Sequence, residues 1–344
     1  MVVMAGGLGS RFWPVSTPEH PKQFVDITAS GRSLIRMTVD RFKGVCPVEN
    51  IWVVTSVNYR EIVKKELPEI PDGNILSEPC MRNTAPCIAY VAWKIKIKDK
   101  HANIVVSAAD HMVKNEAEFR RVMREGLAFT AVRDSILTVG IKPSRPETGY
   151  GYIKTDTGSF SGGIRKVEGF REKPDELTAL RYFEQGSYLW NSGIFLWNVA
   201  TLEKAIRENA PEIAEIFDRI APDLYTEREQ ETVNELFPSC PKISVDYAVM
   251  ESAGNIWVYP ADFGWSDLGT WGSLYELMDK DEKGNAVCGD SVRMVESSGC
   301  IVKVSDAKEV VVQGLEGYIV AEAGGCILIC RRSDEQRIRE FISK

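Results

Sequence analysis

The chain has 344 residues, of which 44% are hydrophobic, and it carries a formal net charge of −7 at pH 7. This length is sufficient to bury a substantial core, and it indicates one large domain together with a smaller one. The acidic balance argues against a nucleic-acid-binding or membrane-binding surface, because such surfaces carry a basic excess. Small anions remain compatible as ligands, since a local cluster of Arg and Lys opposes the overall sign.

The eight cysteines raise the question of disulfide bonds or a zinc site. The sequence has no CxxC pair, and the one close pair, Cys326 and Cys330, lies in the apolar run CILIC. We therefore expect reduced, mostly buried thiols, as in a cytoplasmic protein. No apolar run approaches the ~20 residues that span a bilayer, and no signal peptide is visible.

Four short apolar runs predict strands in the first part of the chain. Each is nearly continuous in its hydrophobicity, which is typical of strands buried on both faces of a parallel sheet. Helical patterns separate the runs, so this part predicts an α/β fold with a layered sheet. The runs are residues 1–5, 51–55 (IWVVT), 104–107 (IVVS) and 136–139 (ILTV).

The predicted helices lie between and after these strands. Ile35 and Val39 recur at helical spacing after Ser33, a favourable N-cap residue. The segment TAPCIAYVAWKIK (84–96) places apolar residues at helical spacing. The segment PEIAEIFDRIAP (211–222) does the same, and it begins with a proline that suits the first helical turn.

The pattern changes after about Asn285. Short β-rich runs, broken by Gly or Asp/Ser turns, predict a small all-β unit. A charged amphipathic stretch, residues 334–344, predicts a terminal helix. This unit carries little obvious chemistry, and we expect it to serve in packing or subunit contact.

A glycine-rich turn, AGGLGSRFWPVSTPEHPK (5–22), follows the first predicted strand. It matches neither the P-loop pattern nor GxGxxG, since Phe12 stands at the sixth position. Glycines allow positive φ and let backbone N–H groups approach phosphate oxygens closely. Arg11 and Lys22 would supply the charge that the phosphates of a nucleotide need. Ligands of α/β sheets bind beyond the carboxyl ends of the strands, where this turn and residues 108–111 would lie.

This turn is one of several ordered motifs that resemble those of the sugar-nucleotide pyrophosphorylases, a group of nucleotidyltransferases. The resemblance covers nearly the whole chain. It implies a Rossmann-like nucleotidyltransferase domain with a mixed, mostly parallel sheet over residues 1–280, and a small C-terminal domain like a partial β-helix over residues 285–344. The other motifs, in the family's order, are RNTAPCIA (82–89), AADH (108–111), ETGYGYI (147–153), FREKP (170–174), WNSGIFLW (190–197), VDYAVME (245–251) and WSDLGTW (265–271).

The version with SRFWP followed by PKQF resembles the branch of the family that uses GTP and mannose 1-phosphate. The implied reaction is an in-line attack by an oxygen of the sugar phosphate on the α-phosphorus of GTP, with release of pyrophosphate. Because two polyanions must meet, positioning and electrostatics should dominate catalysis. The resemblance places Arg11 on the triphosphate, where it stabilises the transition state, and Lys22 on phosphate near the reacting centre.

Further motif residues are assigned by the resemblance to a metal and to the nucleotide. Asp110 and Asp267 would hold one Mg²⁺, which suits hard carboxylate oxygens. Asn83 and Thr84 would orient the base and ribose, although by themselves they indicate a helix cap. His111 is left outside the catalytic set. The glycine-rich turn would line the nucleotide, beside Arg11 and Asp110, through Gly6, Gly7, Gly9 and Ser10.

Sugar recognition is assigned by the resemblance to the middle motifs. Lys173 would hold the sugar phosphate, and Glu172 beside it would accept hydrogen bonds from sugar hydroxyls. Gly149 and Asn191 would supply further backbone and amide contacts, and Asp267 would also bind the sugar phosphate. On the residues alone, Glu172 and Lys173 equally fit a surface ion pair, and WNSGIFLW fits a core strand.

Other functions stay open at this point. The alternatives are a pyrophosphorylase for another pair (heptose 1-phosphate with GTP, or glucose 1-phosphate with dTTP or UTP), a catalytically silent regulator that binds sugar nucleotides, and a Rossmann dehydrogenase. The retained charged residues of the motifs argue against the silent regulator, and the missing GxGxxG argues against the dehydrogenase. Some relatives carry a fused C-terminal isomerase domain of cupin type. The chain ends before one, so we expect a single activity, in a homodimer joined through the small β-rich domain.

Overall fold

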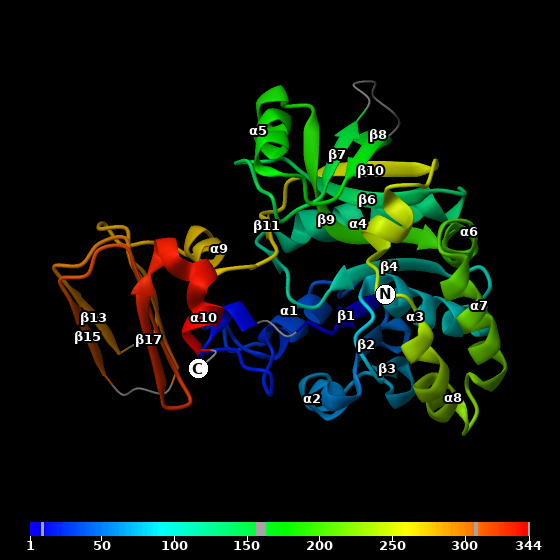
Figure 1. Cartoon of the computed structure of the whole chain (residues 1–344), viewed down its shortest axis with the longest axis horizontal. Coiled ribbons are helices and arrows are strands. Elements are labelled where there is room, and N and C mark those ends of the chain that lie inside the picture. Colours follow the sequence, from blue (N-terminus) through cyan, green and yellow to red (C-terminus); the bar gives the residue numbers. More distant parts are fainter. Residues whose placement is uncertain (8–9, 156–162, 290, 306–308, 343–344) are drawn as a thin grey trace. The chain divides into compact units, whose positions relative to one another are not determined.

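The computed structural model describes residues 1–7, 10–155, 163–289, 291–305 and 309–342. The chain divides into two compact units that alternate along the sequence (Figure 1). None of the helices in the described ranges combines the length and the apolar character needed to cross a membrane. The first unit comprises Met1–Gly6, Arg41–Ala108 and Val113–Trp265, and the second comprises Gly7–Asp40, Ala109–Met112 and Ser266–Lys344.

A mixed sheet with the strand order β3-β2-β1-β4-β9-β6-β10-β8-β7 forms the centre of the first unit. One half of it is parallel: β1 (Val2–Ala5) lies between β2 (Trp52–Ser56) and β4 (Asn103–Ala108), and β3 (Ile75–Glu78) continues next to β2. Most residues of these strands are buried. The predicted strands at 1–5, 51–55 and 104–107 are therefore confirmed.

The other half of this sheet is largely antiparallel, which corrects the expectation of a mostly parallel sheet. The long strand β9 (Tyr188–Asn198) runs antiparallel to β4, to β6 (Ile136–Ile141) and to β7 (Tyr152–Thr155). β8 (Arg165–Arg171) is antiparallel to β7 and β10, whereas β10 (Ile256–Ala261) is parallel to β6. A continuous apolar run reports burial on both faces and not strand direction, so the sequence did not show this reversal.

The helices of the first unit pack on this sheet through apolar side chains. The most buried of them begins at Thr84, and most of its residues from Ala85 to Ile95 lie in one core with Trp197 and Phe217. The predicted helix at 211–222 is also present, and Pro211 occupies its first turn. The helices are α2 (Arg60–Glu66), α3 (Thr84–Lys98), α4 (Glu116–Ala131), α5 (Glu176–Gln185), α6 (Val199–Asn209), α7 (Pro211–Ile220) and α8 (Glu229–Leu236).

Short strands and short helices build the second unit. β12 (Ala286–Cys288), β14 (Ile301–Val304) and β16 (Tyr318–Ala323) pair in parallel, and β17 (Cys326–Arg331) pairs antiparallel with β16. The β-rich pattern predicted after Asn285 is thus present. The remaining elements of this unit are the parallel pair β13 (Val292–Val295) and β15 (Val310–Gln313) and the helices α1 (Leu34–Asp40), α9 (Trp271–Leu277) and α10 (Ile338–Ile342). The short strands β5 (Met112–Val113) and β11 (Trp265–Ser266) pair with each other, and the chain passes from one unit to the other within each of them.

The core of the second unit joins its distant chain segments. Phe12 and Leu34 from the N-terminal part pack with Trp271 and with Ile301 and Ile319 of the β-rich part. The rings of Phe12 and Trp271 have their centroids 5.1 Å apart. Because these apolar side chains share one core, the compact units do not follow the predicted boundary at 280–285.

The cysteines lie within the described ranges, and all eight are free thiols. Cys87, Cys240, Cys288 and Cys330 are among those that are buried, while Cys326 is exposed. This agrees with the expectation of reduced, mostly buried thiols.

Candidate active site

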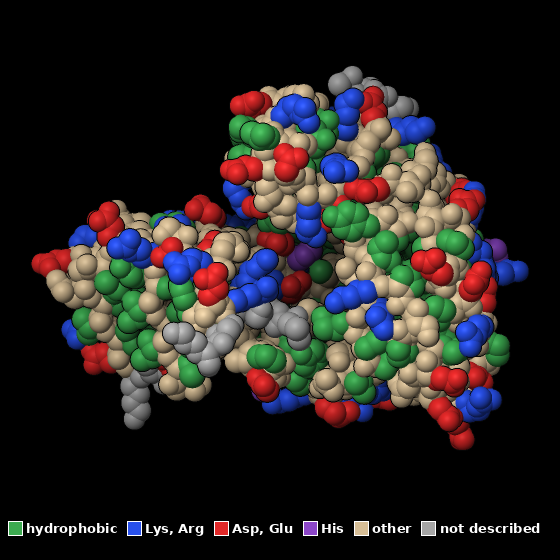
Figure 2. Space-filling model, in the orientation of Figure 1, with side chains coloured by type: hydrophobic (Ala, Val, Ile, Leu, Met, Phe, Trp, Pro, Cys, Tyr) green, Lys and Arg blue, Asp and Glu red, His purple; other side chains and the backbone are tan. Residues whose placement is uncertain are grey.

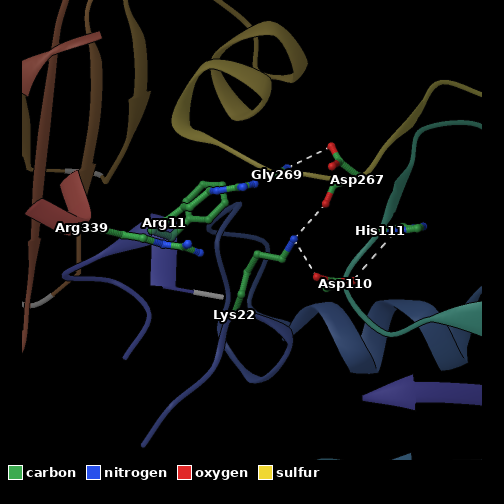
Figure 3. A pocket seen from close by; sticks show the side chains of 8 residues that line it. Arg11, Lys22, Asp110, His111, Asp267, Gly269 and Arg339 are labelled. Carbon is green, nitrogen blue, oxygen red and sulfur yellow. Dashed lines mark hydrogen bonds and ion pairs between the residues drawn. The ribbon is translucent and has the colours of Figure 1, made fainter. Parts of the chain in front are cut away.

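A pocket of about 290 Å³ in the second unit collects charged side chains from separate segments. Figure 3 shows the side chains of Arg11 and Arg339 on one side of it, and those of Lys22, Asp110 and Asp267 on the other. The structure thus brings together the residues to which the sequence assigned catalysis. The lining consists of Arg11, Phe12, Lys22, Asp110, His111, Asp267, Gly269 and Arg339.

Lys22 links the segments that carry the two aspartates. Its side chain is buried, and its Nζ donates to the carbonyl oxygens of Asp267 at 2.8 Å and of Leu268 at 2.9 Å. The same nitrogen forms an ion pair with Asp110 Oδ2 at 2.8 Å. An ammonium group has three N–H donors, and each has an acceptor here. Lys22 therefore acts as an internal cross-link between two loops that are far apart in the sequence.

Asp110 lies in the loop that follows β4. The hydroxyl of Thr38 donates to the carbonyl oxygen of Ala109 at 3.1 Å and so fixes this loop. Burial by itself would raise the pKa of the Asp110 carboxyl, but the charge of Lys22, with a smaller contribution from His111, lowers it below its ordinary value. Asp110 is therefore held in its ionised form, which is the form that binds a cation.

Asp267 lies in a tight turn before α9. Its Oδ1 accepts from the backbone N–H of Gly269 at 3.0 Å. A Cβ atom on Gly269 would lie 2.7 Å from Asp267 Oδ2, so a larger residue cannot stand there while the carboxylate keeps this position. Thr270 then caps α9 through a reciprocal pair of hydrogen bonds with Ser273. The glycine in WSDLGTW is thus required for the close approach of the carboxylate.

The carboxylates of Asp110 and Asp267 form a donor set that fits a hard cation. Mg²⁺ takes oxygen ligands, usually through one or two carboxylates, and keeps its other positions for water and substrate phosphates. The described residues contain no group of three or more His, Cys, Asp or Glu side chains placed to hold a metal ion. An ion at this site would therefore depend on these two carboxylates together with substrate oxygens.

The glycine-rich turn is described only in part. Gly7 O accepts from the side-chain amide of Gln23 at 2.9 Å, and a Cβ on Gly7 would meet open space. Neither Gly6 nor Gly7 has the positive φ that the sequence suggested. Gly9 lies outside the described residues, and of Ser10 only the backbone is described, at the start of a 3₁₀ helix. Gly7 thus leaves room beside the backbone for close approach of a ligand.

Asn83 and Thr84 form the helix cap that their residue types indicate. Asn83 accepts from the N–H of Thr84 at 2.8 Å, and Thr84 Oγ1 accepts from the N–H of Val245 at 2.9 Å. Asn83 has a φ of 68°, an uncommon conformation that clusters at functional sites. The cap fixes the start of α3 in the first unit.

The residues that the resemblance assigned to the sugar lie in the first unit, where the buried carboxylate of Glu172 and the exposed side chain of Lys173 form an ion pair. Lys173 Nζ lies 2.8 Å from Glu172 Oε1, and Glu172 is 7% exposed. Its other oxygen, Oε2, is buried and has no hydrogen-bond partner. A Cβ on Gly151 would lie 2.5 Å from this oxygen and 3.3 Å from Asn191 Cβ. Gly151, from the same motif as Gly149, is therefore the glycine that contacts this cluster, whereas a Cβ on Gly149 would face Glu147.

Asp246 belongs to the same cluster. It lies in the motif VDYAVME, but no role was predicted for it from the sequence. Its Oδ1 accepts from Asn191 Nδ2 at 2.8 Å, and Asn191 Oδ1 accepts from the hydroxyl of Thr138 at 2.9 Å. Burial, and then the nearby charge of Glu172, raise the pKa of Asp246 to about 6. A lone aspartate in a helical sequence carries no signal for this role, because the contact depends on how β9 brings Asn191 to it.

Glu78 is a second buried carboxyl that sequence reasoning missed. It ends β3, it is 6% exposed, and its Oε1 has no hydrogen-bond partner. A Cβ on Gly6 would lie 3.8 Å from its Oε2. Burial raises the pKa of Glu78 to about 8. A strand-end glutamate followed by proline gives no indication of such burial.

Comparisons with known proteins agree with these motifs. A sequence profile of the nucleotidyl transferase family matches residues 1–284. The chain is 35% identical over 356 residues to the mannose-1-phosphate guanylyltransferase of Escherichia coli strain K12, and this match covers 100% of the chain and 72% of the relative. It is 34% identical over 354 residues to the alginate biosynthesis protein AlgA of Pseudomonas fluorescens, covering 99% of the chain and 71% of that protein.

Solved structures show the same likeness. The structure described as mannose-1-phosphate geranyltransferase from Thermus thermophilus has a TM-score of 0.90 at 30% identity, and the match covers 99% of this chain and 97% of that one. A UDP-glucose pyrophosphorylase complexed with UDP-glucose has a TM-score of 0.53 at 16% identity, and it covers 80% of this chain and 95% of its own. The second likeness concerns the fold alone.

Proposed function

Because the chain belongs to the nucleotidyl transferase family, we propose that it transfers the guanylyl group of GTP to mannose 1-phosphate and releases pyrophosphate. The observation that carries this function is the 33–35% identity to curated mannose-1-phosphate guanylyltransferases over 99–100% of the chain. The chain is thus an enzyme that forms a nucleotide sugar. Its own pocket supports the proposal, since it gathers Arg11, Lys22, Asp110 and Asp267.

The proposed reaction exchanges one phosphoanhydride linkage for another. A phosphate oxygen of mannose 1-phosphate bonds to the α-phosphorus of GTP, and the bond from this phosphorus to the bridging oxygen of the β-phosphate breaks. The attacking oxygen is already an anion, so no strong general base is required. The main demand on the protein is to hold both substrates in line and to stabilise charge on the departing pyrophosphate.

Arg11 is proposed to bind the triphosphate from its side of the pocket. A guanidinium group donates two parallel hydrogen bonds to phosphate oxygens, and it stays charged at every relevant pH. Asp110 and Asp267 are proposed to hold Mg²⁺, which would offset phosphate charge of both substrates when bound. The glycine-rich turn, with Asn83 and Thr84, is proposed to take the nucleoside end of GTP.

Lys22 is proposed to position the site, and this replaces the phosphate contact expected from the sequence. Its N–H groups are already matched by Asp110 and by the carbonyl oxygens of Asp267 and Leu268. A direct contact to phosphate would require breaking one of these interactions. Lys22 would therefore act through the two aspartates, which it holds in place before the substrates arrive.

The cluster in the first unit is proposed to bind mannose 1-phosphate. The unpartnered oxygen of Glu172 and the carboxylate of Asp246 would accept hydrogen bonds from sugar hydroxyls, while Lys173 would take the phosphate. Gly151 keeps space beside Glu172 that any larger residue would fill. Asn191 links the carboxylate of Asp246 to the sheet, because it hydrogen-bonds both Asp246 and Thr138.

We propose a cytoplasmic homodimer joined through the β-rich part of the second unit. Free, mostly buried thiols support a reducing compartment. The parallel strands β12, β14 and β16 support a short β-helix. On β17 the side chains of Ile327 and Ile329 are exposed, and Figure 2 shows hydrophobic side chains on the surface of this unit. Light scattering of the wild type and of Ile329→Lys should give dimer and monomer masses respectively.

The experiment that tests the function is pyrophosphate release across a matrix of nucleotides and sugar phosphates. GTP with mannose 1-phosphate should give the highest kcat/KM, and chelation of divalent ions should stop the reaction. A higher kcat/KM for dTTP or UTP with glucose 1-phosphate, or for a heptose 1-phosphate with GTP, would assign the chain to another pair. No release with any pair would identify a silent sugar-nucleotide-binding protein.

A further inference from the structure

The second unit contributes a further arginine, Arg339, to the pocket that holds the proposed catalytic residues. It lies in the C-terminal helix α10, in the part of the chain to which the sequence analysis assigned only packing or subunit contact. From this position we infer that Arg339 binds the outer phosphates of the nucleoside triphosphate, and hence the pyrophosphate product. This inference rests on the proposed function for the identity of its ligand.

The charge distribution within the pocket favours a polyphosphate on the arginine side. Lys22 faces Asp110 and two carbonyl oxygens, so its charge is directed away from that side. Arg11 and Arg339 form the opposite side, as Figure 3 shows. A phosphate chain bound there would have cationic groups at its outer end and the aspartate pair at its reacting end. That polarity matches a triphosphate whose α-phosphorus is attacked.

The position of Arg339 is set by its neighbours in the chain. Ile338, directly before it, is 1% exposed and belongs to the core of the second unit. Glu335 accepts from the N–H of Gly272 at the start of α9 at 2.6 Å, and Arg332 donates to the carbonyl oxygen of Gly299 at 3.0 Å. The C-terminal segment is thus tied to the rest of the unit by Arg332 and Glu335 before α10 and by Ile338 within it, so the helix that carries Arg339 is anchored at the pocket.

Arg337, two residues earlier, supplies the contrast. It forms local ion pairs with Glu340 at 3.3 Å and with Asp334 at 4.0 Å, and it does not line the pocket. Both arginines belong to the same segment and are exposed. Arg337→Ala is therefore a matched control for the removal of one exposed arginine from this segment.

The test measures binding of pyrophosphate, GTP and GMP by titration calorimetry with Mg²⁺, using the full chain as wild type, Arg339→Ala, Arg339→Lys and Arg337→Ala. Arg339→Ala should weaken pyrophosphate and GTP binding about 10- to 100-fold, because a charge-assisted hydrogen bond to phosphate is lost. GMP binding should change less than about 2-fold, since GMP lacks the outer phosphates. Lysine keeps the charge but cannot donate two parallel hydrogen bonds, so the affinities of Arg339→Lys should lie between those of the wild type and of Arg339→Ala.

The outcomes separate this inference from the proposed function. Unchanged GTP and pyrophosphate binding by Arg339→Ala overturns the inference, whether or not the wild type makes GDP-mannose. Equal weakening for GMP and GTP, together with a lower melting temperature, also overturns it, because that pattern identifies a structural role. A wild type that forms no GDP-mannose while Arg339→Ala still loses pyrophosphate affinity overturns the proposed function and supports the phosphate site.

Discussion

Replacement of Lys22 by methionine tests whether this residue is the internal cross-link that the structure shows. Methionine fills a similar volume but removes three hydrogen bonds donated by a buried ammonium group, one of them to Asp110. Removing one partner of a fully buried pair costs about 3–5 kcal/mol, because the other charge is left without compensation. Since the side chain of Asp110 is 28% exposed, we expect a loss at or below the lower end of this range. Set against a typical free energy of unfolding of about 5–15 kcal/mol, this leaves a folded but weakened protein.

The pH dependence gives this prediction its sign. In the wild type the pKa of Asp110 is lowered, so its stabilising contribution is present above the ordinary carboxyl pKa and is lost as the pH falls through the lowered value. Without Lys22, the main interaction that lowers the pKa of Asp110 is removed, so burial raises this pKa. The deficit of Lys22→Met should therefore be largest at neutral pH and should shrink toward pH 4, as Asp110 takes up a proton.

The assay is urea unfolding at pH 7.5 and at pH 4.5, followed by circular dichroism. Lys283→Met, which removes an exposed lysine of the same unit, should stay within about 0.5 kcal/mol of the wild type. The double variant Lys22→Met/Asp110→Asn should recover most of the lost stability, because it removes the uncompensated charge. A loss below about 1 kcal/mol for Lys22→Met, or an equal loss at both pH values, would refute the cross-link.

Other residues lead to further predictions. Asp267→Ala should reduce kcat by at least about 100-fold in a protein that still folds, because alanine keeps the backbone oxygen to which Lys22 donates; near-normal turnover in Mg²⁺ would contradict its metal role. Glu78→Gln should stabilise the protein by roughly 2–4 kcal/mol near pH 7.5 and hardly at all at pH 4.5. The reason is that the pKa of Glu78 is raised to about 8 in the folded state, so the wild-type protein loses stability as the pH rises from 4.5 through 8. A difference in melting temperature between variant and wild type that does not change with pH would contradict this prediction. In the wild type, KM for mannose 1-phosphate should rise as the pH falls through about 6, because Asp246 takes up a proton and loses acceptor capacity. Asp246→Asn should lack this part of the pH dependence, and identical pH profiles would count against a sugar contact. Gly151→Ala should raise that KM about tenfold or more, since its Cβ would lie 2.5 Å from Glu172 Oε2, while Gly149→Ala serves as the matched control.

The elements that the sequence predicted well are those whose burial is local and continuous. The structure contains the strands predicted at 1–5, 51–55, 104–107 and 136–139 and the helices predicted at 84–96 and 211–222. These elements were predictable because the spacing of apolar residues along a short segment indicates its secondary structure. Strand direction was not predictable in the same way. The antiparallel direction of β9 depends on its pairing with distant segments, and a hydrophobic run does not indicate which segments will pair.

The candidate site shows a similar division. The motifs located Arg11, Lys22, Asp110 and Asp267, and the pocket contains all four. The role of Lys22 was not predictable, because its acceptors are mostly backbone oxygens on a turn near the other end of the sequence. Arg339 was missed for a related reason. An arginine in a charged terminal stretch is typical of an exposed surface, and its place in the pocket depends on the packing of the neighbouring Ile338 in the core.

The way the chain alternates between its two units sets an order for biosynthesis. Residues 7–40 leave the ribosome long before 266–344, yet the apolar side chains of both segments share one core. At translation rates of ~5–20 residues per second, the early segment waits on the order of ten seconds or more for its partner. Completion of the proposed nucleotide pocket is therefore coupled to synthesis of α10. A nascent chain that is released early would lack Arg339, and the side chains of Phe12 and Leu34 would stay exposed to solvent.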